Sequence, residues 1–242
     1  NLTVNGVHVG VSQNAEGVWV VDNTATGALS WLKANNPEVF QNGTVQYGTA
    51  LYAYSNNGMN ATLSPAGEDA KLVRYLIGST VKDVIVEDGI KVIGDRTFRD
   101  ASNLASIVLP QSLTELEEGA FQQCGLTSIT IPGENVTLGK QSIGYLPNLE
   151  TITITAKKVT VGNYCARACT KLKSVYIYSD EITFAAGGSM YFTDCESNNT
   201  SGITFYVSSQ AIADAVNAAY PNGHAKGMQI KSIDGTVTYY SR

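Results

Sequence analysis

Histidine and charged side chains are scarce in this chain of 242 residues. It contains two histidines, His8 and His224, and charged residues make up only 15% of it. A Ser-His-Asp or Cys-His catalytic centre needs a histidine beside its nucleophile, and structural zinc is held by Cys and His. Because the two histidines stand near opposite ends of the chain, the sequence argues against catalysis of these types and against a zinc site.

The chain also lacks an excess of positive charge and a long apolar run. Sixteen Lys and Arg against 21 Asp and Glu give a net charge of −5. Nucleic acids and anionic lipids select basic surfaces, and a membrane-spanning helix needs about 20 apolar residues in a row. We therefore expect no nucleic-acid partner and no membrane insertion by this segment. The chain begins at Asn1 without Met or a signal-peptide pattern, as in a mature or trimmed product.

What the sequence does contain is an apolar motif that returns every 22 or 23 residues. Each copy has apolar residues at offsets 0, 3 and 5, and the middle positions of the first five copies are 23, 22, 23 and 23 residues apart. A degenerate sixth copy follows after a step of 28. The copies are Val81, Val84 and Val86; Leu104, Ile107 and Leu109; Leu126, Ile129 and Ile131; Leu149, Ile152 and Ile154; Leu172, Val175 and Ile177; and Thr200, Ile203 and Phe205. Such a period is typical of a solenoid, whose repeats bury a common core only by stacking.

Each copy has a second half with its own apolar residues. These are Ile90, Ile93 and Phe98; Leu113, Leu116 and Phe121; Leu138 and Ile143; and Val161 and Ala166. Gly94, Gly139 and Gly162 follow in three copies, and we expect a tight turn with positive φ there. The pattern predicts one elongated, right-handed solenoid of short parallel strands stacked about 4.8 Å apart. We divide it into an N-terminal cap (1–70), a repeat region (71–207) and a C-terminal cap (208–242).

The two caps are expected to be irregular, because the end of a solenoid would otherwise expose its apolar core. In the first cap we predict strands at 3–11 and 18–21, a short helix at 28–34 capped from within 22–24, and a hairpin at 45–63. Residues 1–45 could instead form a separate module. In the second cap we predict a helix at 211–219 and a hairpin at 230–240 with a type I′ turn at Asp234-Gly235.

The repeats resemble a known family. The segments VKDVIVEDGIKVIGDRTFRDASNLASIVLP and SLTELEEGAFQQCGLTSITIP are similar to the BspA-like leucine-rich repeats, over residues 81 to 205. The resemblance implies a leucine-rich-repeat solenoid, which is α/β by convention but rich in strands. It also implies a secreted or cell-surface bacterial protein with a role in adhesion. The Phe is replaced in two copies, and the fifth carries an insertion around 185–189.

The four cysteines follow the repeat. Cys124, Cys169 and Cys195 occupy one position in different copies, and Cys165 takes the small-residue position of Ala120. Cys124 and Cys169 are two copies apart, about 10 Å at strand spacing, which is too far for a disulfide. A bridge between Cys169 and Cys195 stays open, although small buried thiols are the favoured interpretation.

The carboxylates do not form a recognisable catalytic or calcium pattern. Glu115, Glu117 and Glu118 cluster in one copy, and Glu87, Asp88 and Asp95 lie in the copy before it. Acid–base catalysis by a carboxylate pair needs one member desolvated, and nothing around these residues indicates that. Asp180, Glu181, Asp194 and Glu196 lack the repeated Asp/Gly ladder of a calcium-binding repeat, and Gly187-Gly188 is too short for a phosphate loop. We therefore expect no catalytic residue, no metal and no cofactor.

One surface stands out as a candidate binding site. Residues between the apolar positions of each strand point away from the core, and in the last copies they are Tyr176, Tyr178 and Tyr206. Tyrosine is enriched at binding hot spots, so we predict a ligand-contacting patch at the C-terminal end of the sheet. Two alternatives are that the terminal hairpin, with Tyr239 and Tyr240, covers the patch, and that the patch is a homodimer contact.

These observations predict a non-enzymatic binding or adhesion module that recognises a protein or glycan partner, from a host or from bacteria. A structural spacer or assembly unit without a specific ligand is the alternative, and an enzyme acting on glycans is less favoured. The sequence does not name the partner, the surface anchor or the oligomeric state.

Overall fold

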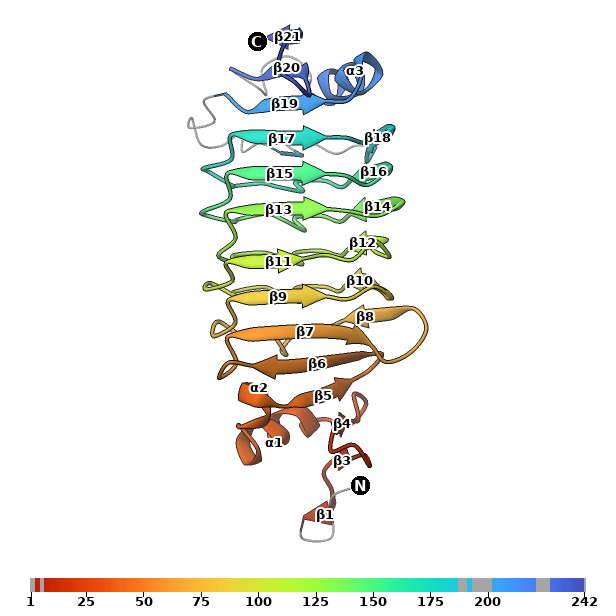
Figure 1. The fold of residues 1–242 in the computed structure, drawn as a ribbon, viewed down its shortest axis with the longest axis vertical. Coiled ribbons are helices and arrows are strands. Elements are labelled where there is room, and N and C mark those ends of the chain that lie inside the picture. Colours follow the sequence, from red (N-terminus) through yellow and green to blue (C-terminus); the bar gives the residue numbers. More distant parts are fainter. Residues whose placement is uncertain (1–2, 5–6, 187–190, 193–201, 221–226, 242) are drawn as a thin grey trace.

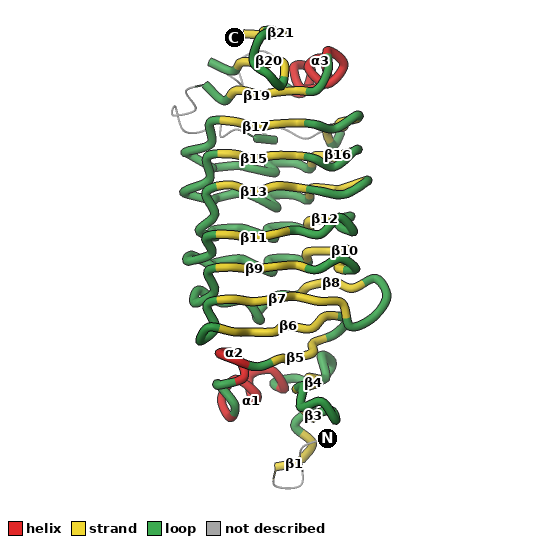
Figure 2. The backbone as a smooth tube through the Cα atoms, in the orientation of Figure 1, coloured by secondary structure: helices red, strands yellow, loops and turns green. Residues whose placement is uncertain are grey.

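The structure is a computed structural model that describes residues 3–4, 7–186, 191–192, 202–220 and 227–241, the first four of these without their side chains. It is an elongated stack of strands, with the N-terminal elements at one end and the C-terminal elements at the other (Figure 1). Turns and loops join the short strands, and the helices of the described residues lie near the ends (Figure 2). This is a solenoid of short stacked strands, as predicted.

The first strand of each coil lies in a long face that is built from two sheets. The seven-stranded sheet has the order β11-β9-β7-β6-β5-β4-β3, and the six-stranded sheet has the order β13-β15-β17-β19-β20-β21. Their strands are β3 (Val11–Gln13), β4 (Trp19–Val21), β5 (Thr44–Tyr47), β6 (Ala50–Ser55), β7 (Asn60–Pro65), β9 (Asp83–Val86), β11 (Ser106–Val108), β13 (Ser128–Ile131), β15 (Thr151–Ile154), β17 (Ser174–Ile177), β19 (Thr204–Val207), β20 (Gln229–Ser232) and β21 (Thr238–Ser241).

The second halves of the coils form another parallel sheet. Its order is β18-β16-β14-β12-β10-β8, so that each coil adds one strand to it. The strands are β8 (Ala70–Leu72), β10 (Ile90–Ile93), β12 (Glu115–Leu116), β14 (Asn135–Leu138), β16 (Lys158–Val161) and β18 (Glu181–Phe184). The apolar residues predicted for both halves are buried between the sheets, except Ile107, which is half-buried, and Thr200, which lies outside the described residues.

The long face is interrupted once, between β11 and β13. These strands lie in different sheets, whereas all later strand pairs from β13 to β19 are parallel and in register. The break coincides with the single 22-residue step, from Ile107 to Ile129. The same 22-residue step leaves the second sheet intact, because Glu115 pairs with Thr137 and Leu116 with Leu138.

Columns of equivalent residues run through the core. Thr97, Ala120, Ser142 and Cys165 form a column of small buried residues, linked through bonds such as Phe98 N to Ala120 O (2.8 Å) and Phe121 N to Ser142 O (2.8 Å). The next column is Phe98, Phe121, Ile143 and Ala166, all buried. The rings of Phe98 and Phe121 stack with centroids 4.9 Å apart. Each coil therefore packs on identical positions of its neighbours.

The structural reason predicted for the glycines after the second strands, a positive φ, is wrong. Gly94, Gly139 and Gly162 do not have a positive φ. Instead the amide of Gly94 donates to the Leu72 carbonyl (3.0 Å), and a Cβ on Gly94 would lie 2.3 Å from that oxygen. The same close approach holds for the other two glycines. Glycine is required here because two backbones meet, not because the turn is left-handed.

The residues with a positive φ lie two positions after this glycine position in each coil. Arg96 (φ 52°), Gly119 (φ 63°), Gln141 (φ 54°) and Tyr164 (φ 56°) occupy this position. Three of the four are not glycine, so composition did not reveal the turn. A second left-handed position follows four residues later, at Asp100, Gln123, Tyr145 and Ala168. The coil thus bends at two defined points.

The N-terminal segment joins the long face and adds two helices. The strand predicted at 3–11 is split into β1 (Thr3–Val4), β2 (Val7–His8) and β3, and the hairpin predicted at 45–63 is a three-stranded meander, β5-β6-β7. The helices are α1 (Ala28–Asn35) and α2 (Val39–Asn42). The predicted cap of α1 is wrong: Gly27 is the N-cap, while Asp22 accepts bonds from Thr24 in a preceding turn. Strand β4 pairs in parallel with β5.

The C-terminal segment closes the other end. Helix α3 (Gln210–Ala219) begins after Ser209, whose hydroxyl accepts a bond from Ile212 N (3.3 Å). The predicted hairpin is present as β20 and β21, but it does not contain a type I′ turn. Only Gly235 of the two turn residues has a positive φ, and the strands are joined by the five residues 233–237. Asp234 instead accepts bonds from Thr236 N (3.0 Å) and Thr236 Oγ1 (2.8 Å), an Asx turn that favours the longer loop.

Candidate functional site

The candidate site predicted from the sequence is the tyrosine patch, Tyr176, Tyr178 and Tyr206. Tyr176 in β17 is the register partner of Tyr206 in β19, and their rings stack with centroids 4.6 Å apart and planes inclined by 10°. Tyr178 follows β17 and is 48% exposed. The structure therefore brings Tyr176 and Tyr206 into direct contact on the outward face, with Tyr178 exposed beside that strand.

The patch is the aromatic part of a continuous outward row. The register partners along this row are Thr130, Thr153, Tyr176, Tyr206 and Lys231. The neighbouring outward row contains Ser128, Thr151, Ser174, Thr204 and Gln229. Hydroxyl side chains thus occupy these rows in β13 and β15, and the tyrosines of the first row lie in β17 and β19 and are followed by a lysine. Side chains in register across neighbouring strands interact directly, which explains the stacking.

The terminal hairpin does not fold across the sheet over the patch. Strand β20 pairs edge to edge with β19, so the hairpin continues the sheet. Tyr240 lies opposite Ile230, and its hydroxyl donates to Asp214 of α3 (2.6 Å). The turn at Gly235 approaches the ring of Tyr206, since a Cβ there would lie 3.7 Å from its Cε1. Tyr176 and Tyr206 are half-buried, and Tyr178 is the most exposed of the three.

Glu117 and Glu118 of the carboxylate cluster form ion pairs with residues of other coils. Glu117 pairs with Lys71 (2.5 Å), and Glu118 lies 3.6 Å from Arg96 and 3.5 Å from Lys140. Similar pairs join Lys91 to Asp69, Lys157 to Glu134, Lys158 to Glu181 and Lys173 to Glu150. In the Glu117–Lys71 pair the residues are 46 positions apart, which is two coils, whereas the other pairs are 22 or 23 positions apart and join one coil to the next. Exposed pairs of this kind contribute little stability individually.

The cysteines are small core residues. Cys124, Cys165 and Cys169 are buried free thiols, and burial raises the pKa of each to about 12. Cys165 lies 3.6 Å from the hydroxyl of Ser142 in the small-residue column. Cys195, the other partner of the bridge that the sequence left open, lies outside the described residues.

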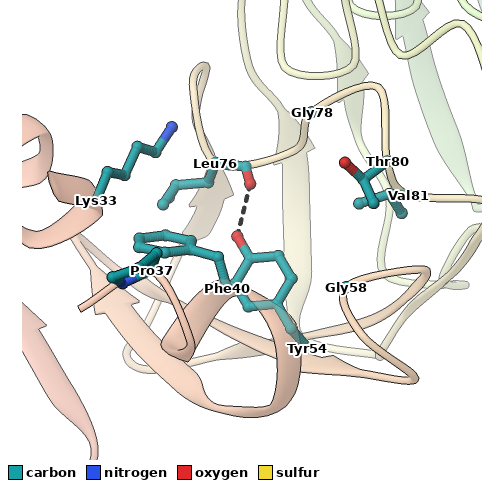
Figure 3. A pocket seen from close by; sticks show the side chains of 9 residues that line it. All are labelled: Lys33, Pro37, Phe40, Tyr54, Gly58, Leu76, Gly78, Thr80 and Val81. Atoms are coloured by element: carbon teal, nitrogen blue, oxygen red, sulfur yellow. Dashed lines mark hydrogen bonds between the residues drawn. The ribbon is translucent and has the colours of Figure 1, made fainter.

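The sequence did not reveal a pair of adjoining cavities at the N-terminal end. The first, of about 250 Å³, is lined by residues that include Lys33, Pro37, Phe40, Tyr54 and Leu76 (Figure 3). Burial raises the pKa of Tyr54 well above its usual range, so its hydroxyl stays protonated and donates to the Leu76 carbonyl (2.6 Å). These residues come from α1, α2, β6 and the loop after β8, and no sequence spacing connects them.

The second cavity lies on the other side of Lys33. Its volume is about 400 Å³, and its lining includes Asn23, Thr24, Ser30, Tyr47 and Tyr75. The ammonium of Lys33 donates to the Tyr75 carbonyl and lies 5.6 Å from the centre of the Phe40 ring. Desolvation lowers the pKa of Lys33.

The part of the chain that the structure describes contains neither a metal-binding cluster nor a membrane-spanning helix. No group of three or more His, Cys, Asp or Glu side chains is placed to hold a metal ion there. Among the helices of the same residues, none is long and apolar enough to cross a membrane. The segment with Gly187-Gly188, and Asp194, Glu196 and His224, lie outside them, as does the side chain of His8.

Comparison with known proteins gave solved structures of similar architecture. The pneumococcal vaccine antigen PcpA is 20% identical with a TM-score of 0.49, over 78% of this chain and 47% of the antigen's chain. A leucine-rich-repeat protein of T. pallidum is 15% identical with a TM-score of 0.44, over 72% of this chain and 95% of its own. This chain thus spans about half the length of PcpA. A search of curated proteins found no significant match.

The family profile described as "BspA type Leucine rich repeat region" matches six copies over residues 76–200. The match covers more than half of the chain, and it includes the stacked coils β9 to β18. Repeats of this kind are typical of protein-interaction modules and are generally non-enzymatic. The chain belongs to the BspA-type leucine-rich-repeat family.

Proposed function

We propose that this chain is a non-enzymatic binding or adhesion module of a secreted or surface-exposed bacterial protein. It recognises a protein or glycan partner, of host or bacterial origin, through the tyrosine patch on the long face. The observation that supports this most is the stacked pair Tyr176 and Tyr206 beside the exposed Tyr178. The family supports an interaction role and a bacterial surface location.

The chemistry of the patch suits a partner that is both flat and polar. A tyrosine ring provides a rigid apolar surface, and its hydroxyl can donate or accept a hydrogen bond. Ring stacking holds Tyr176 and Tyr206 in one orientation, so that little side-chain entropy remains to be lost on binding. Lys231, the register partner of Tyr206, adds a cation at one edge. The flanking hydroxyl row offers further hydrogen bonds.

The test is binding to immobilised host matrix proteins and to a glycan array. We expect the wild-type chain to bind at least one member, and Tyr176→Ala/Tyr206→Ala to bind it at least tenfold more weakly, which corresponds to about 1.4 kcal/mol. The matched control is Thr130→Ala/Thr153→Ala, which alters the same row in the middle coils and should leave binding unchanged. Thermal unfolding of all three proteins shows whether the fold is retained. Equal binding by the wild type and the tyrosine variant, or none by either, would overturn the patch proposal.

A spacer or assembly unit remains the second candidate, and one observation favours it. The outward rows of β13 and β15 consist of Thr and Ser in register, with Ser128 opposite Thr151 and Thr130 opposite Thr153. A uniform polar surface suits separation of other domains better than recognition. The absence of a ligand for the wild type in the experiment above would favour this role.

An enzyme acting on glycans has less support. Carboxylates of the cluster at Glu117 and Glu118 form ion pairs with Lys71, Arg96 and Lys140. A glycosidase needs two carboxyl groups on either side of a substrate, one of them protonated. Glu117 and Glu118 each contact cations of other coils, so this cluster does not suit that chemistry.

A further inference from the structure

The two cavities at the N-terminal end meet at Lys33, far along the stack from the tyrosine patch. The elements that form them, α1, α2, β6 and the loop between β8 and β9, lie at the N-terminal end in Figure 1, and β17 and β19 lie near the other end. A ligand here would occupy a site separate from the one proposed above. Ligand cavities of a few hundred Å³ are typical for small molecules, and the larger cavity alone is about 400 Å³.

Lys33 is a cation without an anionic neighbour. Among the described residues, no carboxylate lies within ion-pair distance of Lys33, whereas six other lysines have such a partner. Its ammonium is held over the Phe40 ring and against the Tyr75 carbonyl, which uses one of its three donors. Desolvation disfavours its charge, as the lowered pKa shows. An anion in the cavity would stabilise the charged form of the Lys33 ammonium.

Tyr75 is held in an unfavourable backbone conformation at the same place. Its φ is 79°, a region that bulky residues rarely adopt, yet its side chain is 63% exposed and packs against no core. The Arg74 guanidinium lies 4.7 Å from the centre of its ring and helps to orient it. Strained residues that structure holds in place concentrate at ligand sites. The exposed ring is a platform for a flat ligand face.

The backbone around this ring is fixed by two contacts from other elements. Tyr54 donates to the carbonyl of Leu76, and Lys33 donates to that of Tyr75 (Figure 3 shows the first of these). The rings of Phe40 and Tyr54 also contact each other, with centroids 5.6 Å apart. Consequently the loop that presents Tyr75 is anchored before any ligand binds.

The linings of the two cavities differ in a way that defines a ligand. The larger one carries an amide and hydroxyls from Asn23, Thr24, Thr26 and Ser30, together with two tyrosine rings. The smaller one contributes the apolar side chains of Pro37, Phe40, Leu76 and Val81. A matching molecule has hydroxyl groups on a ring with an apolar face, a carboxylate that reaches Lys33, and a small apolar substituent.

We propose that these cavities bind an acidic, N-acetylated sugar. Its carboxylate pairs with Lys33, its ring lies against Tyr75 in the larger cavity, and its acetyl methyl group enters the smaller one. Two common sugars share this chemistry, N-acetylneuraminic acid and N-acetylmuramic acid. The proposal is independent of the tyrosine patch, because it uses different residues at the other end of the solenoid.

The test is ligand-observed NMR or calorimetry on the full chain with three probes. These are N-acetylneuraminic acid, N-acetylmuramic acid and, as the neutral control, N-acetylglucosamine. We expect at least one acidic probe to bind with a Kd in the millimolar range or below, and the neutral probe to bind at least tenfold more weakly. Whichever of the two acidic sugars binds more tightly indicates whether the natural ligand comes from a host or from bacteria. Absence of binding by both acidic sugars at about 10 mM, or equal binding of the neutral sugar, would overturn the proposal.

Two variants connect binding to the site. Lys33→Met keeps the apolar stem but removes the charge, and Tyr75→Gly removes the ring while relieving the left-handed conformation. Each should weaken binding of the acidic sugar at least tenfold. Lys171→Met, at an exposed lysine far from both cavities, is the control and should leave binding unchanged. If one variant fails to fold, the other decides; if both fold and bind like the wild type, the site is not here.

The same measurement separates this proposal from the one above. Tyr176→Ala/Tyr206→Ala should retain binding of the acidic sugar, and Lys33→Met should retain whatever partner the tyrosine patch binds. Loss of the acidic sugar in the tyrosine variant would place it on the long face and overturn the assignment to the N-terminal cavities.

Discussion

The stacked coils and the N-terminal cap are stabilised by different kinds of contact. In the coils, each residue packs on the equivalent residue of the next coil, as Phe98 does on Phe121. In the cap, single long-range contacts hold unlike elements together, as the Tyr54 hydroxyl does with the Leu76 carbonyl. Repetition buries Phe98 and Phe121 fully in the coil interior, whereas the unlike elements of the cap leave cavities between them. The regular part of this molecule is therefore suited to rigidity, and the irregular part to small ligands.

The largest expected effect concerns the accessibility of the coil interior. Burial raises the pKa of Cys124, Cys165 and Cys169 to about 12, from 9.0, which lowers their thiolate fraction about a thousandfold. In a Cys195→Ser background these thiols should react with iodoacetamide at least about a thousandfold more slowly in the folded protein than in urea. Ser30→Cys, exposed in the cap, should react rapidly. Rapid labelling of the coil cysteines would show that the coils open as easily as the cap.

The next effect is on stability, through the aromatic column. Phe121→Ala removes a fully buried ring that stacks on Phe98, and we expect a loss of about 3–5 kcal/mol in the free energy of unfolding. Phe40→Ala, in the cap, removes a half-buried ring and should cost about 1–2 kcal/mol. Urea unfolding measures both. Equal losses would mean that the cap is packed as tightly as the coils.

A smaller effect is expected where the backbones of neighbouring coils meet. Gly94→Ala places a methyl group 2.3 Å from the Leu72 carbonyl, so the coils must separate locally, at a cost of about 1–3 kcal/mol. Gly67→Ala is the matched control, because a Cβ there meets no atom within 4 Å and φ is not positive. It should change stability by less than about 0.5 kcal/mol. Thermal unfolding that ranks Gly67→Ala as the more damaging change would contradict the close-approach explanation.

The smallest expected effect concerns one hydrogen bond in the cap. Tyr54→Phe leaves the ring packed on Phe40 but removes the donor to the Leu76 carbonyl, and it should cost about 1 kcal/mol. Hydrogen exchange should become faster in the loop at 74–80 and stay unchanged in β15 and β17. Faster exchange throughout the coils would show that the cap and the coils unfold together.

Several features of the coils could be predicted from the sequence because they repeat. The apolar triads, the column of Phe98 and Phe121, and the equivalence of Cys165 with Ala120 were correct. The reason for Gly94 was wrong, because its constraint is the neighbouring carbonyl rather than its own φ. The left-handed turn at Arg96, Gln141 and Tyr164 was missed, since those residues carry no common signal. The sequence shows which residue type occupies a repeat position, but not which structural constraint selects that residue type.

The caps were less predictable because their contacts are not repeated. Asp22 was predicted to cap α1, but it turns the chain earlier, and Gly27 precedes the helix instead. Lys33 and Tyr75 are 42 positions apart, and nothing in their local sequence indicates that they meet. By contrast, Tyr176 and Tyr206 could be expected to meet despite a separation of 30, because both occupy the same offset of a repeat.

The sequence by itself determined the solenoid, the membership of its columns and the outward position of the tyrosines. Because the repeat has a fixed length, each coil packs on the next copy of itself. Residues at the same repeat position are therefore in contact in the structure. Only the tertiary structure decided that the terminal hairpin extends the sheet, that charged side chains pair between coils, and that Lys33 lines two cavities without an anionic partner among the described residues. Those features depend on contacts between segments that are not equivalent in sequence. The free energy of such contacts depends on the shape and charge of the two surfaces, which the repeat pattern does not specify.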